Sequence, residues 1–171
     1  MSNNEIGGYF DVDLRGTRYT PEGTKAIAEA IRVSPFITSI DLSENDLGSG
    51  AAKGLAQAIA VNTSITSVGK DGLNLKDNYF GAEGWGAIFA AICSSQVSKI
   101  TSIDASGEGI GPEGAKLIGQ ALGNSVNASL TSVRYAIDID SLNGSFGVEQ
   151  YICVPCHLVG QLEQQRNRRI L

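Results

Sequence analysis

Apolar and polar residues change their spacing in the same order several times along the chain. Alternating residues such as Ile40-Asp41-Leu42 predict a strand, and the glycine-rich residues after them predict a turn. Apolar residues four positions apart then follow, which places them on one face of a helix. These pairs are Ile27 and Ile31, Leu55 and Ile59, Ile88 and Ile92, and Ile118 and Leu122. The pattern predicts units of strand, turn and helix.

Two short landmarks recur with nearly the same interval. A tetrapeptide of the form Ile-Thr-Ser-Ile begins at Ile37, Ile65, Ile100 and Leu130, at intervals of 28, 35 and 30 residues. An alanine followed by a branched aliphatic residue recurs at Ala30, Ala58, Ala91 and Ala121, at intervals of 28, 33 and 30 residues. Because one such unit cannot bury its apolar face alone, the units are expected to stack into one solenoid domain.

Proline and glycine mark where the helices begin. The segments Thr20-Pro21-Glu22 and Gly111-Pro112-Glu113 place proline at the start of a helix and a glutamate near its positive end. Glycine contributes 21 of the 171 residues and proline only 4. This excess of glycine indicates many tight turns rather than a disordered linker.

The repeated unit resembles a known repeat family. Residues 40–48 read Ile-Asp-Leu-Ser-Glu-Asn-Asp-Leu-Gly and look like the L-x-L-x-x-N-x-L-G core of a leucine-rich repeat. The long helical half resembles the ribonuclease-inhibitor-like class, and further copies lie in 12–19, 73–81 and 103–111. The resemblance covers residues 9–135, about four repeats and a final strand. It implies an α/β leucine-rich-repeat solenoid with a parallel sheet on the concave face and helices on the convex face.

The chain departs from the family pattern in two places. The family's asparagine is present as Asn45 and Asn78 but is replaced by Thr17 and Glu108, so a continuous asparagine ladder is not expected. Residues 69–72 are an insertion, which we expect to bulge from the strand or from its preceding loop.

Residues 1–8 precede the repeats as an N-terminal extension. Residues 136–171 lose the pattern and are interpreted as a divergent C-terminal cap, because an open solenoid end needs a polar cover.

Charge and composition exclude several classes of function. The chain has 13 basic and 18 acidic residues and a net charge of −5, which disfavours binding to nucleic acid. The N-terminus lacks the pattern of a signal peptide, and no segment approaches the roughly 18 apolar residues of a membrane span. The chain has three cysteines, which are too few for a disulfide framework, so we expect a cytoplasmic protein.

The sequons at Asn62 and Asn127 fall at one point of the repeat and indicate a turn rather than a glycan. A third sequon is at Asn143.

One glycine-rich motif resembles a dinucleotide site. Residues 109–114 read Gly-Ile-Gly-Pro-Glu-Gly, after a predicted strand and at the start of a predicted helix. The same turn recurs at 20–23, 48–51 and 81–84, so the repeat itself explains these glycines. About 20 residues further on, where a nucleotide site would place an acidic residue, the chain has Arg134. We expect no nucleotide cofactor.

The C-terminal region contains a second motif, Cys153-Val154-Pro155-Cys156-His157. It has the spelling of a haem attachment site, but His157 is the only histidine and Met1 the only methionine, so the usual second axial ligands are nearly absent. Zinc could take Cys153, Cys156 and His157, with Cys93 or a carboxylate as a fourth ligand. We expect no metal and no other cofactor.

The chain has one histidine, and no serine or cysteine nucleophile is placed beside a base by the repeat pattern, so we also expect no enzymatic activity.

The predicted strands supply the candidate binding residues. Residues between the core positions of each strand point to the sheet face, and we assign partner binding to Asp11, Asp13, Arg15, Asp41, Lys76, Asp104 and Arg134. The uncharged members of this face are Ser39, Ser43, Asn74, Ser102 and Ser106. The alternative is an ordinary hydrated sheet face. Trp85 could anchor a partner, although we favour its packing against the next repeat.

These features favour a non-enzymatic module that presents a curved repeat surface to a protein partner. Self-association is also open. A second hypothesis is a regulator of a small GTPase, because residues 21–31 and 112–118 are similar to repeats of Ran GTPase-activating proteins. A third is a structural subunit or a fragment of a larger repeat array. The identity of the partner cannot be read from these residues.

Overall fold

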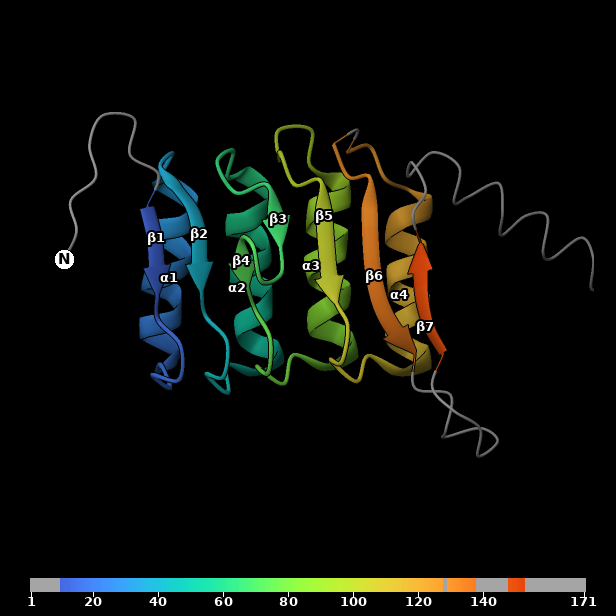
Figure 1. The fold of residues 1–171 in the computed structure, drawn as a ribbon, viewed down its shortest axis with the longest axis horizontal. Helices are drawn as coiled ribbons and strands as arrows, with labels where there is room; N and C mark the ends of the chain where they lie inside the picture. The colour runs from blue at the N-terminus through green and yellow to red at the C-terminus, as the bar shows by residue number, and fades with distance from the viewer. Residues whose placement is uncertain (1–9, 128, 138–147, 153–171) are drawn as a thin grey trace, which may run out of the picture.

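The computed structural model describes residues 10–127, 129–137 and 148–152 and shows a row of strands backed by helices (Figure 1). The helices are α1 (Pro21–Val33), α2 (Gly48–Val61), α3 (Gly81–Ser94) and α4 (Gly111–Gly123). The strands are β1 (Phe10–Asp13), β2 (Ile37–Asp41), β3 (Ser67–Val68), β4 (Leu73–Asn74), β5 (Ser102–Ala105), β6 (Ser132–Ile137) and β7 (Val148–Ile152). Each helix follows a strand of the same repeat, as the spacing predicts.

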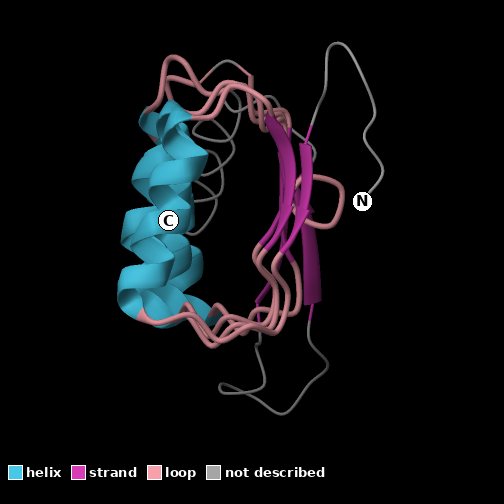
Figure 2. Ribbon diagram, turned by 90° about the vertical axis from the view of Figure 1, so that its left-hand side faces the viewer, coloured by secondary structure: helices cyan, strands magenta, loops and turns pink. Residues whose placement is uncertain are grey.

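The molecule has two layers, a sheet and a row of helices that covers one side of it (Figure 2). The strands lie in the order β1-β2-β4-β3-β5-β6-β7. All neighbours pair in parallel except β6 and β7, which are antiparallel. The prediction of an α/β solenoid with strand-turn-helix repeats is confirmed.

The helices begin in two different ways. At α1 the Thr20 hydroxyl accepts the N–H of Gly23 at 3.2 Å, and Pro21 follows at the first helical position. The other three helices have no side-chain cap and begin at Gly48, Gly81 and Gly111, whose φ angles are 68°, 62° and 65°. A left-handed φ favours glycine, which accounts for part of the glycine excess.

The core lies between the sheet and the helices. Its largest buried side chains are Trp85, Phe80 and Phe89, all in or beside α3, and the predicted helix-face positions from Ile31 to Leu122 are also buried. Trp85 is only 1% exposed, and its ring packs edge-on against Phe80 with ring centroids 5.9 Å apart. Trp85 therefore packs inside the solenoid, and it is not accessible as a partner anchor.

Buried asparagines stabilise the turns at both edges of the sheet. Where strands lead into helices, the Asn78 side chain accepts the Asn45 N–H and donates to the Leu42 carbonyl at 2.8 Å. Where helices lead into strands, the Asn62 amide donates to the Ile31 carbonyl at 2.7 Å, and that of Asn127 donates to the Ile92 carbonyl at 2.9 Å. The sequons at Asn62 and Asn127 are thus turn residues with buried side chains. The sequon at Asn143 lies outside the described residues.

The insertion divides one strand into β3 and β4. The loop between them, residues 69–72, stands out from the sheet on the side away from the helices (Figure 2). It is closed by the Gly69 N–H, which donates to the Leu73 carbonyl at 2.8 Å, and by the Gly72 N–H, which donates to the Gly69 carbonyl at 3.1 Å. The predicted bulge from the strand is confirmed.

The C-terminal end of the sheet contains a strand, β7, that was not predicted from the sequence. β6 continues to Ile137, and β7 pairs with it from Val133 with Ile152 to Ile137 with Val148. In Val148-Glu149-Gln150-Tyr151-Ile152 two polar residues stand in succession, so the sequence has no apolar-polar alternation that would predict this strand. The boundaries at residues 8 and 136, and the C-terminal cap, remain predictions.

Candidate interaction surface

The described helices cover only one side of the sheet (Figure 2). We call the other side the sheet face. Strand pairing brings its predicted residues into register: Asp13 lies beside Asp41, and Asp41 lies beside Asn74. Across the sheet, Asp104 lies beside Arg134. Asp11 pairs with Ser39 through its backbone, but its side chain is outside the described part of the structure. The predicted residues therefore share one face in two groups, with the 69–72 loop between them.

The acidic residues of this face also shape the ends of the strands. In each repeat an Oδ1 atom accepts the N–H of the residue two positions further on. The distances are 3.1 Å for Asp13 to Arg15, 2.9 Å for Asp41 to Ser43, 3.3 Å for Asn74 to Lys76 and 3.0 Å for Asp104 to Ser106. Because Asn74 makes the same turn without a charge, the turn requires only the oxygen. The charges of the three aspartates exceed what the fold needs.

Ion pairs and hydrogen bonds modulate these charges. Arg15 Nη2 lies 3.2 Å from Asp13 Oδ2, and Arg134 Nη1 lies 3.3 Å from Asp104 Oδ2. Burial raises the pKa of Asp41, but hydrogen bonds from the Ser43 hydroxyl and N–H and from Asn74 outweigh burial, so the net pKa is lowered. Lys76 is exposed at the end of this row, and Lys70 and Asp71 are exposed on the protruding loop. The face therefore mixes positive and negative groups.

The edge where strands lead into helices is charged, and we call it the charged edge. Its turns contain all five non-glycine residues with positive φ among the described residues, namely Arg18, Glu44, Asp46, Asp77 and Tyr79. Tyr79 is 77% exposed. Glu108 takes the place of the family's asparagine and accepts two donors, the Asp77 N–H and Trp85 Nε1, each at 3.3 Å. Burial raises the pKa of Glu108.

Two converging donors explain why the asparagine is replaced at this position. An asparagine offers one acceptor oxygen, whereas a carboxylate offers two. Trp85 stands where the other repeats have Thr24, Ala52 and Ala115, so no other helix supplies an equivalent indole N–H. The expected interruption of the asparagine ladder is therefore observed. Glu108 accepts hydrogen bonds as the asparagines do, but its carboxylate does not donate to backbone carbonyls as their amides do.

The opposite edge, where helices lead into strands, is apolar. Five of the six exposed large hydrophobic residues among the described ones lie there, between 48% and 60% exposed. They are Val33, Phe36, Val61, Val97 and Val126, and we call them the apolar edge. This feature was not predicted from the sequence, although Val33 and Val61 occupy the same position of successive repeats, two residues after the landmark isoleucine.

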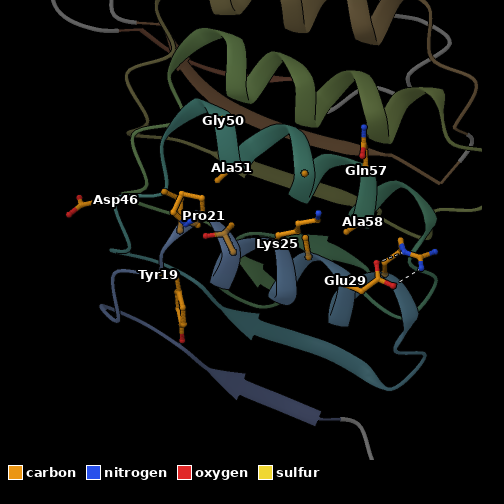
Figure 3. A pocket seen from close by; sticks show the side chains of 14 residues that line it. Tyr19, Pro21, Lys25, Glu29, Asp46, Gly50, Ala51, Gln57 and Ala58 are labelled. Atoms are coloured by element: carbon orange, nitrogen blue, oxygen red, sulfur yellow. Dashed lines mark hydrogen bonds and ion pairs between the residues drawn. The ribbon is translucent and has the colours of Figure 1, made fainter.

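A groove of about 740 Å³ runs between α1 and α2 on the helix side. Lys25 and Glu29 of α1 line one side, and Gly50, Ala51 and Ala58 of α2 line the other (Figure 3). The equivalent groove between α3 and α4 has only about 300 Å³, because Leu117 replaces Gly54 and lies against Gly86. The large groove results from small side chains on α2.

Other predicted sites fall largely outside the described residues. Cys153, Cys156 and His157 are not described, whereas Cys93 is buried in α3. In residues 10–127, 129–137 and 148–152 no group of three or more His, Cys, Asp or Glu side chains is placed to hold a metal ion. Over the same residues, none of the helices combines the length and apolar character needed to cross a bilayer.

Comparisons with known proteins report on the fold. No protein-family model and no curated sequence matches the chain. Among solved structures, it is similar to Leiomodin-1 Actin-Binding Site 2, with a TM-score of 0.60 and 17% identity over 94% of this chain and 84% of that one. It is also similar to the tropomodulin C-terminal domain of Caenorhabditis elegans, with a TM-score of 0.59 and 18% identity over 95% of this chain and 89% of that one. The chain shares the fold of these domains. At this identity the likeness concerns the fold alone.

Proposed function

We propose that the chain is a non-enzymatic protein-interaction module that binds a protein partner through the sheet face. The observation that carries the proposal is the charge on Asp13, Asp41 and Asp104. Asn74 forms the same strand-end turn without a charge, so the turn does not explain why these three residues are carboxylates. Solenoids commonly bind partners on their sheet surfaces, and charged groups there contribute to orientation and association rate.

The likeness to Leiomodin-1 Actin-Binding Site 2 supports an interaction module in general terms. It also makes actin the first named partner to test. We further propose that the chain is a member of the leucine-rich-repeat family of the ribonuclease-inhibitor-like class and acts in the cytoplasm. Neither of the two similar structures is named as a GTPase regulator, so regulation of a small GTPase gains no support from them.

The test is a pull-down from source-cell lysate, with purified actin co-sedimentation in parallel. The native chain is compared with a D13N/D41N/D104N variant, which removes three charges but keeps the Oδ1 acceptor that each turn needs. The matched control, E22Q/E83Q/E113Q, removes three charges from the first turns of α1, α3 and α4. We expect the partner to be retained by the control and lost by the strand variant.

Circular dichroism and thermal unfolding establish that both variants are folded. If the folded strand variant captures the same partners as the native chain, the assignment to the sheet face is wrong. If the control loses the partner equally, total charge rather than the sheet face determines binding.

A further inference from the structure

The apolar edge carries an inference independent of the sheet face. Isolated exposed hydrophobic residues are normal on soluble proteins, but a row of them in one region marks a contact surface. Here every repeat contributes: Val33 and Phe36 come from the first helix-to-strand connection, Val61 from the second, Val97 from the third and Val126 from the fourth. The helix-to-strand turns are formed by buried polar side chains such as Asn62, so these apolar residues are not needed to make them.

The charges around this edge indicate what can cover it. In residues 33–38, 61–66, 94–101, 124–127 and 129–131, the only charged residue is Lys99. None of these residues is acidic, although the chain has a net charge of −5. Most of the described acidic residues instead lie on the sheet face, at the charged edge and in the first turns of the helices. Glu29, near the end of α1, is paired with Arg32 at 2.6 Å. Two copies of this chain would therefore repel each other in most orientations, but they can meet at this edge without bringing acidic groups together.

The order of the repeats makes the edge complementary to itself. Parallel strands place all four connections at one edge in the order of the sequence (Figure 1). A two-fold axis across that edge reverses the order in the second copy, so the first connection meets the fourth and the second meets the third. The connection that carries Phe36 then meets the one that carries Val126 in the copy, and the connection that carries Val61 meets the one that carries Val97. Each connection with exposed apolar residues therefore meets another such connection.

We propose that the apolar edge is an interface between two copies of this chain, arranged antiparallel about a two-fold axis. The sheet face is a separate surface, so this association does not depend on partner binding there.

The test measures mass by sedimentation velocity and light scattering from about 1 to about 100 µM, where a dimer of micromolar affinity is partly dissociated. We expect the native chain to shift from monomer to dimer over this range. V61K and V97E should each be monomeric throughout, because each places an unpaired charge against an aliphatic group. The control Y79E changes a more exposed side chain on the opposite edge and should dimerise like the native chain.

The V61K/V97E double variant tests the arrangement itself. The two-fold axis places position 61 of one copy opposite position 97 of the other, so the two new charges are opposite in sign and should restore dimers at least in part. Circular dichroism checks that all variants fold. A native chain that stays monomeric overturns the proposal, as does a dimer that survives V61K and V97E. A double variant as monomeric as the single variants overturns the two-fold pairing.

Discussion

The two edges of the solenoid connect the same layers but are built from different residues. At the charged edge the chain turns tightly from strand to helix, with left-handed residues such as Glu44, Asp77 and Tyr79. At the apolar edge three of the four cap residues, Ser34, Asn62 and Ser95, are extended, with ψ between 119° and 138°, whereas the fourth, Asn124, has a ψ of 12°. Tight turns demand glycine or polar residues that satisfy nearby backbone groups, whereas extended connections accept valine and phenylalanine. The fold therefore determines many of the residue types at the charged edge. It leaves those at the apolar edge free to be selected for binding.

The largest expected effect comes from removing the buried asparagine that supports either edge. Asn62→Ala and Asn78→Ala should each lower the free energy of unfolding by about 2–4 kcal/mol, because each leaves several buried backbone groups without a partner. Urea denaturation measures the change. The exposed Asn124, replaced by alanine, serves as the control and should cost less than about 0.5 kcal/mol. If only one of the two buried substitutions is costly, the edges are not supported equally.

A smaller effect is expected at Glu108, where the charged edge departs from the asparagine pattern. Glu108→Gln offers one acceptor to two donors, so it should cost about 1–2 kcal/mol. The same substitution in a Trp85→Phe background should cost less, because one of the two donors is already absent. Equal costs in the two backgrounds would show that the indole and the carboxylate are not coupled.

The Glu108 variant should also change the pH dependence of stability. Burial raises the pKa of Glu108 above the value of about 4.3 expected for an unfolded chain. Its contribution to stability is therefore fully present below that unfolded value and is lost as the pH rises through the folded pKa. The difference in stability between the native chain and Glu108→Gln should shrink as the pH rises from about 4.3 through the folded pKa of Glu108. A difference that grows over this range would contradict the raised pKa.

The smallest effect is expected at Tyr79, whose φ of 55° is unfavourable for a bulky residue. Tyr79→Gly should raise stability by about 0.5 kcal/mol, because relief of the left-handed strain slightly exceeds the entropy that glycine adds to the unfolded chain. Tyr79→Ala keeps the strain and removes the ring, so it separates the two contributions. Thermal unfolding of the three proteins gives the order; a glycine variant less stable than the alanine variant would refute strain at this position.

The repeat order was predictable because each unit needs the same two features, an apolar helix face to bury and a tight turn before the helix. Isoleucines four apart, such as Ile88 and Ile92, and turn glycines such as Gly81 are visible without coordinates. β7 was not predictable because it pairs outside the repeat pattern, and its residues do not alternate between apolar and polar. The role of Glu108 depends on Trp85, which is 23 residues away in sequence, so only the packed structure brings the two donors to one carboxylate.

The candidate surfaces were predictable to different degrees. Alternation in the strands placed Asp13, Asp41 and Asp104 on one face, because side chains alternate across a strand. The apolar edge was not predicted, because a valine at a helix end such as Val61 has the same character in sequence whether it is covered or exposed. Exposure depends on which connections the neighbouring repeats leave uncovered, and that follows only from the stacking.

The antiparallel strand β7 limits how the array can grow. Each strand-turn-helix unit adds its strand parallel to the one before it, and the position beside β6 is already occupied by a strand of the opposite direction. A further repeat of the same kind cannot continue the parallel pairing there. Growth of this solenoid by duplication of its unit is therefore confined to insertion among the existing repeats or to addition beside β1.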